Sequence, residues 1–201
     1  MQAELSAEPG AAQPNIQVKS GLQRVVFGNE DGSQLLIVGA NDISAHGLAP
    51  YEGWESLLNR LVNGLELLRD HLKRPEFTTL GVRYINRVVI PEPQFRFEDY
   101  LTLGFVGPPG LPPNVQSFFD RIETVYPDGR TRVAFTWATT EAEPGTAAFV
   151  LDFDFNMNCA EGEVLSVTQV REGLQELKQK ETAAFESMLQ DSLRETFREV
   201  H

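Results

Sequence analysis

Four charged side chains on two predicted strands have the types and the spacing to do chemistry. Side chains alternate between the faces of a strand, so Arg83 and Arg87 lie on one face of the first strand. Asp152 and Asp154 lie on one face of the second strand, about 7 Å apart and within reach of one Mg²⁺ ion. If the two strands are neighbours, the four side chains form a polar site for a divalent cation or an anion.

The same four side chains also suit a structural role. Opposite charges on adjacent strands form salt-bridge ladders on the half-solvated face of a sheet. Asp-x-Asp is a common pattern, and the two arginines oppose the binding of a metal ion unless a phosphate group bridges them. The ladder is the simpler interpretation, and the ligand site is the alternative.

The strand that carries the arginines has a second, more apolar face. Tyr84 and Asn86 lie on this face together with aliphatic side chains. A buried amide must be hydrogen-bonded, so Asn86 either ties down neighbouring backbone or contacts a ligand. The candidate ligand-binding residues are therefore Arg83, Tyr84, Asn86, Arg87, Asp152 and Asp154.

The sequence lacks the residue patterns on which common enzyme classes depend. Its three histidines are far apart and do not have a metal-binding spacing. It has no Gly-x-Ser-x-Gly motif. Segment 104–110 is rich in glycine but lacks the Lys-Ser/Thr of a phosphate-binding loop, and its prolines remove amide donors. Acidic neighbours of the single cysteine, Cys159, raise a thiol pKa rather than lower it. We therefore predict no catalytic residue, no metal centre and no cofactor.

Composition restricts both the class of protein and its partners. The chain has 201 residues, of which 41% are hydrophobic, and its 13 Phe, 2 Trp and 4 Tyr are too many for a disordered chain. No stretch approaches the roughly 20 apolar residues of a membrane-spanning helix, and the N-terminal residues do not have the pattern of a signal peptide. The net charge of -12 repels nucleic-acid phosphate. We predict a cytoplasmic protein that binds neither nucleic acid nor membrane.

Hydrophobic periodicity predicts the elements of the first half of the chain. Two strands, over residues 22–27 and 35–38, are joined by a tight turn at Asp31-Gly32. Leucines at helical spacing from Leu57 to Leu68 predict an amphipathic helix that begins near Pro50 and ends before Pro75. The strand of Arg83 and Arg87 follows, over residues 78–90.

The second half begins with a proline-rich segment, residues 91–113. Phe95, Phe97, Tyr100, Leu103 and Phe105 make this segment an ordered, irregular cover rather than a linker. Three strands in a meander and a long C-terminal helix complete the chain. They are predicted over residues 116–125, 132–138, 147–157 and, for the helix, 166–198 with a bend or break near residues 180–182.

This order of elements, ββ-α-β-βββ-α, predicts an α+β fold. Hairpin connections favour a mostly antiparallel sheet of about six strands, covered on one face by two amphipathic helices. Residues 1–20 lack an apolar period and are predicted to be a flexible leader. Residues 21–201 are predicted to form a single domain.

The segment Gly81-Val-Arg-Tyr-Ile-Asn-Arg87, followed by Val-Val-Ile-Pro91, resembles a motif of the TIGR04255 family of sporadically distributed bacterial and archaeal proteins. Other stretches agree in the same order over residues 20–199: Phe27 with Glu30-Asp31-Gly32, Pro50-Tyr51 with Gly53-Trp54, Glu98-Asp99-Tyr100, Leu151-Asp152-Phe153-Asp154, and Phe185 with Leu193-Arg194-Glu195 and Phe197. The resemblance implies no particular activity. Members of that family have a longer N-terminal segment, so it also implies an unpaired sheet edge that accepts a partner strand or a second copy.

Three functions follow from these observations. The first is a non-catalytic protein-binding or regulatory module with a protein partner or a homo-oligomeric state, because catalytic patterns are missing and the acidic surface suits basic partners. The second is a small-ligand or metal-dependent enzyme or binding protein that uses Arg83, Arg87, Asp152 and Asp154. The third is a cavity between sheet and helix that holds an apolar ligand, since the many Phe residues permit one.

Overall fold

The computed structural model describes residues 2–6, 15–19, 24–69, 76–104, 110 and 116–197. Within these ranges the chain has an α+β fold with antiparallel sheets, as predicted. The chain divides into two compact units, residues 1–73 and 74–201. The prediction of one sheet of about six strands is wrong, because the first unit has a three-stranded sheet and the second has a four-stranded sheet. The single domain over residues 21–201 stays a prediction.

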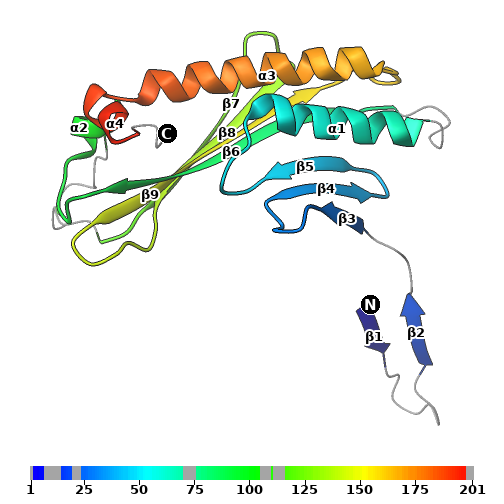
Figure 1. Ribbon diagram of the computed structural model, residues 1–201, viewed down its shortest axis with the longest axis horizontal. Helices are drawn as coiled ribbons and strands as arrows, with labels where there is room; N and C mark the ends of the chain where they lie inside the picture. Colours follow the sequence, from blue (N-terminus) through cyan, green and yellow to red (C-terminus); the bar gives the residue numbers. More distant parts are fainter. Residues whose placement is uncertain are drawn as a thin grey trace. The chain divides into compact units, whose positions relative to one another are not determined.

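The first unit contains a hairpin, a three-stranded sheet and one helix (Figure 1). Its elements are β1 (Gln2–Ser6), β2 (Asn15–Lys19), β3 (Arg24–Gly28), β4 (Gln34–Gly39), β5 (Ile43–Gly47) and α1 (Trp54–Arg69). Strands β1 and β2 pair with each other, and β3, β4 and β5 pair in that order. Both strands of this hairpin lie within residues 1–20. That these residues act as a flexible leader stays a prediction.

The predicted hairpin of β3 and β4 is confirmed, including its turn. Gly32 has a φ of 73°, which glycine adopts readily, and the Asp31 side chain accepts a hydrogen bond from the Ser33 amide at 2.8 Å. Strand β5 was not predicted. It has one large apolar residue, Ile43, so its sequence has no alternating pattern, and it is a strand because a tight turn returns it along β4.

Helix α1 packs on β4 and β5 within this unit. Leu58, Val62 and Leu65 are its buried apolar side chains. Arg60 on the helix pairs with Glu52 and donates a hydrogen bond to the His46 carbonyl oxygen of β5 at 3.0 Å. The predicted helix is confirmed; Pro75, which was predicted to end it, lies outside the described residues.

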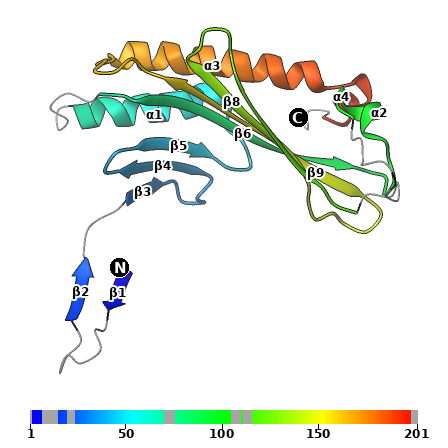
Figure 2. The same ribbon diagram turned by 180° about the vertical axis from the view of Figure 1, so that it is seen from behind.

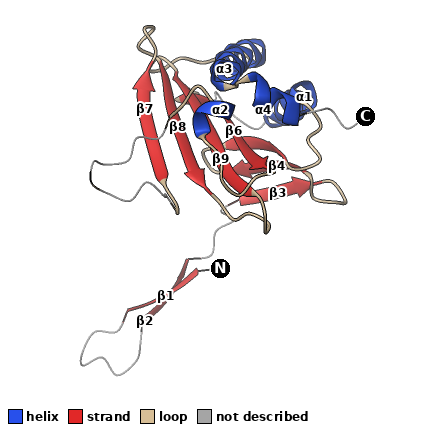
Figure 3. Ribbon diagram, turned by 90° about the vertical axis from the view of Figure 1, so that its left-hand side faces the viewer, coloured by secondary structure: helices blue, strands red, loops and turns tan. Residues whose placement is uncertain are grey.

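The second unit is built on a four-stranded antiparallel sheet in the order β6-β9-β8-β7, in which β7 is an outer strand (Figure 3). Helix α3 packs on β6 and β9, and the short helices α2 and α4 lie side by side at one end of the sheet (Figures 1 and 2). The elements are β6 (Thr79–Ile90), α2 (Phe97–Tyr100), β7 (Phe119–Val125), β8 (Thr131–Thr139), β9 (Ala147–Asn158), α3 (Val167–Met188) and α4 (Asp191–Thr196). The prediction that two helices cover one sheet face is wrong, because α1 and α3 each pack on the sheet of their own unit.

The core of the second unit lies between α3 and the apolar faces of β6 and β9. The buried side chains include Val82 on β6, Phe155 on β9 and Leu177 on α3. Gly173 lets the helix approach the sheet closely, since a Cβ there would lie 2.7 Å from Leu80 Cδ1. The alternating apolar side chains of β6 and β9 therefore face α3, as the sequence predicted.

Helix α3 begins where the sequence predicts and ends earlier. Ser166 caps its N-terminus and forms a capping box with Gln169. The helix runs without a break past residues 180–182, because Glu181 faces inward and pairs with Lys178 at 2.5 Å instead of interrupting the helix. It ends at Met188, and the chain turns at Leu189 into α4, so the predicted position of the break is wrong.

Aromatic side chains from the proline-rich segment pack on the end of the sheet. The centroid of the Phe97 ring lies 5.1 Å from that of Trp137 and 5.6 Å from that of Phe149. The Phe95 ring stacks on Phe149 with centroids 6.1 Å apart. The predicted ordered cover is confirmed for these residues. Phe105, which was also assigned to it, lies outside the described residues.

A lysine on α3 ties the helix to the turn between β7 and β8. Lys180 Nζ lies 2.8 Å from Asp128 Oδ2 and 2.9 Å from the buried hydroxyl of Thr131. The hydrogen bond from Lys180 is the largest cause that lowers the Asp128 pKa, and amide donors of Thr131 and Arg130 lower it further. The charged form of Asp128 is therefore favoured by folding.

The contact between Lys180 and Asp128 predicts that the protein becomes less stable at acidic pH. Because folding depresses the Asp128 pKa, its contribution is fully present above the ordinary value of 3.8 and is lost as pH falls below it. We expect the melting temperature of the wild type to fall more steeply than that of Asp128→Asn between roughly pH 5 and pH 2, measured by circular dichroism. Asp42→Asn, in the first unit, controls for the loss of one negative charge. Parallel pH profiles for wild type and Asp128→Asn would contradict the prediction.

Candidate functional site

The pairing of β6 with β9 brings together the four charged residues singled out in the sequence. Arg83 lies opposite Asp154 in the register, and Asp152 lies opposite Ile85. Arg83 reaches diagonally to Asp152, with Nε 2.9 Å from Oδ1 and NH2 2.6 Å from Oδ2. This two-point contact raises the pKa of Arg83. The expectation that the two strands are neighbours is confirmed.

Arg87 and Asp154, the other two of these four residues, also have hydrogen-bond partners within the protein. Arg87 donates to the Glu141 carbonyl oxygen at 2.8 Å, and Asp154 accepts a hydrogen bond from Asn156 at 2.7 Å. Among the described residues, no group of three or more His, Cys, Asp or Glu side chains is arranged to hold a metal ion. One cross-strand ion pair and hydrogen bonds to neutral groups therefore favour the structural interpretation of this face over a metal site.

Tyr84 lies on the opposite face of β6, beneath α3. Lys178 Nζ is 3.7 Å from the centroid of the Tyr84 ring and also pairs with the buried carboxylate of Glu181. The ring and the carboxylate together compensate the charge of a lysine that is mostly withdrawn from water. These contacts explain how an ion pair is tolerated inside the apolar stripe of α3.

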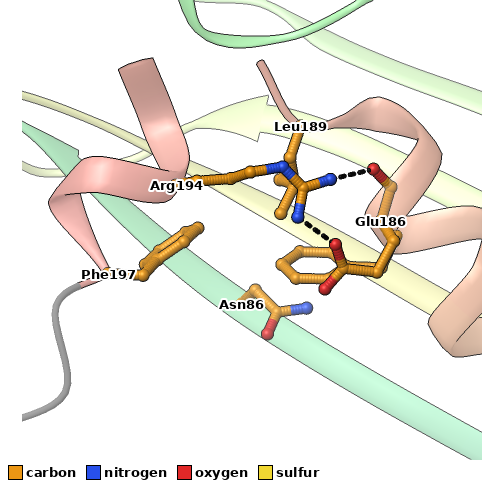
Figure 4. Close-up of a pocket in the computed structure, with 6 residues that line it drawn as sticks. Asn86, Glu186, Leu189, Arg194 and Phe197 are labelled. Atoms are coloured by element: carbon orange, nitrogen blue, oxygen red, sulfur yellow. Dashed lines mark hydrogen bonds and ion pairs between the residues drawn. The ribbon is translucent and has the colours of Figure 1, made fainter. Parts of the chain in front are cut away.

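Asn86 lies two residues further along the same face and lines a pocket between β6, the C-terminal end of α3, and α4 (Figure 4). The pocket has a volume of about 430 Å³ and is open to solvent. Its lining residues are Asn86, Phe185, Glu186, Leu189, Arg194 and Phe197. The Asn86 Nδ2 atom is buried and has no hydrogen-bond partner among the described residues.

The pocket offers two aromatic rings and one unused donor. The rings of Phe185 and Phe197 have centroids 6.4 Å apart. Arg194 pairs with the Glu186 side chain and donates to the Glu186 carbonyl oxygen at 2.7 Å, so its charge is compensated (Figure 4). A small apolar group that carries one hydrogen-bond acceptor would match this lining. Sequence analysis named Asn86 as a candidate ligand-binding residue but did not assign the other lining residues to a site, because the pocket depends on where α3 ends.

The outer strand β7 exposes large apolar side chains on both of its faces. Phe119 is 72% exposed, Ile122 is 51% exposed and Val125 is 52% exposed. Ile122 lies across from Phe135 on the helix side, whereas Phe119 and Val125 lie on the face of the polar ladder. Sequence analysis predicted this strand. It did not predict the outer position, because the alternation of residues along a strand does not determine the order of strands in a sheet.

The backbone of β7 has one set of hydrogen-bonding groups directed away from the sheet. At one end of the strand, the Tyr126 amide donates to the Thr131 carbonyl, and at the other the Thr139 amide donates to the Phe118 carbonyl. In an antiparallel ladder these directions alternate. Even-numbered residues of β7 therefore bond to β8, and Phe119, Arg121, Glu123 and Val125 direct their amides and carbonyls outward. Among the described residues, no strand pairs with this outer edge.

Cys159 is not poised as a nucleophile. Burial raises the pKa of its thiol, and the nearby Glu163 carboxylate raises it further. The direction agrees with the sequence-based prediction, and the acidic neighbour that contributes is Glu163.

Comparisons with known proteins assign no relative to this chain. No family model, no curated protein and no solved structure matches it. Membership of the TIGR04255 family therefore stays a prediction. A search of the described residues also finds no helix that is both long and apolar enough to cross a membrane.

The ladder interpretation of the polar face predicts a weak coupling between Arg83 and Asp152. In a double-mutant cycle of Arg83→Met and Asp152→Asn, we expect a coupling free energy of about 0.5–1 kcal/mol in urea unfolding, because Arg83 is half-exposed to solvent. We also expect no rise in melting temperature when Mg²⁺ or phosphate is added. A ligand-induced rise that Asp152→Asn abolishes would contradict the ladder and support the ligand site.

The unpartnered amide of Asn86 predicts that an apolar side chain is better tolerated there. A buried donor without a partner costs about 1–3 kcal/mol, so we expect Asn86→Leu to raise the free energy of unfolding by about 1 kcal/mol. Asn156→Leu is the matched control on β9, and it should destabilise the protein because it removes a hydrogen bond to Asp154. A loss of more than about 1 kcal/mol in Asn86→Leu would show that the amide is already bonded within the protein.

Proposed function

We propose that this chain is a non-catalytic protein-binding or regulatory module whose binding surface is the outer edge of β7. The observation that carries the proposal is an edge with which no described strand pairs and along which three large apolar side chains are exposed within seven residues. An outer strand presents a row of free amides and carbonyls that another strand can pair with. Native sheets usually protect such edges, so one that is both apolar and unpaired favours an interaction.

Strand addition explains why both faces of β7 carry apolar residues. A partner strand would pair its backbone with the outward groups of Phe119, Arg121, Glu123 and Val125, which supplies affinity for any extended segment. Ile122 on one face, and Phe119 and Val125 on the other, would contact the alternating side chains of that segment. These side-chain contacts would provide the specificity.

The charge of the chain narrows the proposed partner class. The net charge of -12 disfavours nucleic acid, which is bound through phosphate neutralisation. We therefore propose a protein partner in the cytoplasm. Family membership, if TIGR04255 is the family, adds no activity to this proposal.

A second candidate function is the binding of a small ligand in the pocket at Asn86. The unused Nδ2 donor in a pocket that Phe185 and Phe197 also line favours it. The same variant tests it, because a compound that needs the amide would bind the wild type and fail to bind Asn86→Leu. An enzyme that uses Arg83, Arg87, Asp152 and Asp154 has less support, since each of these side chains already has a hydrogen-bond partner within the protein.

The protein-binding proposal predicts which surface variant loses partners. We expect Ile122→Lys, immobilised and incubated with an extract of the host, to retain its specific partner at least about tenfold less than the wild type does. The reason is that burying one such side chain contributes about 1.5–3 kcal/mol. Quantitative mass spectrometry of the captured proteins measures the ratio.

The control is Leu67→Lys on α1, because Leu67 is also a highly exposed apolar residue. It should retain the same proteins as the wild type. Equal capture by the wild type and Ile122→Lys would contradict the proposed surface, and loss of capture by both variants would indicate a nonspecific effect of the added charge.

A further inference from the structure

We propose that the partner strand at β7 is β7 of a second copy, paired antiparallel around a two-fold axis at Ile122. This inference rests on the proposed function and names its partner. In this arrangement the four-stranded sheets of two copies join into one continuous sheet. The strand order leaves β7 at the edge where this can happen (Figure 3).

Backbone directions limit the registers that two β7 strands can adopt. Outward groups belong only to the odd-numbered residues, so an odd residue must lie opposite an odd residue of the second copy. A shift by one residue would place outward groups opposite groups already bonded to β8. The allowed antiparallel registers therefore differ from one another by steps of two residues.

Charge selects one register among these. Centred on Ile122, Arg121 of each copy lies opposite Glu123 of the other, which makes two opposite-charge pairs. Centring the pair on Arg121 places two arginines opposite each other, and centring it on Glu123 places two glutamates opposite each other. The register centred on Ile122 is the one that the sequence of β7 complements.

The exposed apolar residues of β7 favour the same register. On the helix side, Ile122 meets Ile122 of the second copy in a pair without hydrogen bonds, where side chains are closest. On the opposite face, Phe119 meets Val125 of the second copy at both ends of the interface. The exposed apolar residues of β7 are therefore matched by one another.

Arg121 and Glu123 already interact within one strand, with Nε 2.9 Å from Oε1. They lie on the same face, so the second copy would convert this single contact into a cluster of two arginines and two glutamates. Charged residues on an edge strand ordinarily discourage pairing. Here their alternating signs disfavour the registers centred on Arg121 and on Glu123 and complement the register centred on Ile122.

We expect a weak dimer, because a seven-residue strand pair is smaller than a standard stable interface. Two chains with a net charge of -12 also repel each other. At about 0.15 M salt the Debye length is about 8 Å, so this long-range repulsion is screened while contacts across the strand pair persist. The experiment is therefore done at that salt concentration.

The first test is charge exchange, measured by sedimentation velocity between about 1 and 200 µM protein. We expect the wild type to shift from monomer to dimer, and Arg121→Glu alone or Glu123→Arg alone to weaken the dimer at least about tenfold. The double variant Arg121→Glu/Glu123→Arg should regain it, because the exchanged charges are again opposite each other. An equimolar mixture of the two single variants should also associate, since each then supplies the charges that the other lacks.

The second test probes the two-fold axis. In a Cys159→Ser background, Ile122→Cys should form an intermolecular disulfide on mild oxidation, because opposite residues of a pair without hydrogen bonds have Cα atoms about 4.5 Å apart. Asp120→Cys should not, because position 120 lies opposite Thr124 in this register. Equal cross-linking at both positions would overturn the register.

The outcomes separate this inference from the proposed function. A wild type that stays monomeric over the whole range overturns the second copy as partner, and so does a dimer that both single charge variants leave intact. If Ile122→Lys still loses a captured protein in those cases, the β7 surface remains the proposed binding site and its partner is another chain. If neither self-association nor Ile122-dependent capture is found, both proposals fail.

Discussion

The long antiparallel pairing of β6 with β9 is the constraint on which the rest of the second unit depends. All twelve residues of each strand take part in it, from Thr79 opposite Asn158 to Ile90 opposite Ala147. Because side chains alternate along both strands, this one register directs most of the apolar residues of both strands toward α3 and their charged residues to the open face. A slip by one residue would direct the phenylalanines of β9 to solvent and its aspartates toward α3.

The two faces created by this register have different chemistry. On the open face, Arg83 and Asp152 satisfy each other, Arg87 bonds to a backbone carbonyl, and Asp154 accepts a hydrogen bond from an amide side chain. On the covered face, apolar packing against α3 is interrupted by one donor, on Asn86, that nothing among the described residues satisfies. A self-satisfied polar face has little free energy to gain from a ligand, whereas an unpaired donor beside aromatic rings has more.

The outer edge at β7 follows from the same arrangement. Strands β9 and β8 are the inner strands of the order β6-β9-β8-β7, and β7 is bonded to β8 on one side only. Helix α3 packs on β6 and β9 rather than on β7, so Ile122 stays half-exposed although it lies on the covered face. Exposure of β7 is therefore a consequence of strand order and helix placement, not of the composition of β7 itself.

The amino-acid sequence by itself determined the elements whose residues follow a clear periodic or turn pattern. Alternation identified β6 and β9 and the faces of Arg83, Tyr84, Asp152 and Asp154, the leucine spacing identified α1, and glycine in positive-φ turns identified the hairpins. Tertiary structure decided the remainder. Strand β5 forms only because β4 pairs with it, and α3 continues past Glu181 because Lys178 neutralises that carboxylate inside the fold. The division into two sheets, the outer position of β7 and the pocket at Asn86 depend on contacts between residues distant in sequence, and no local periodicity encodes those contacts.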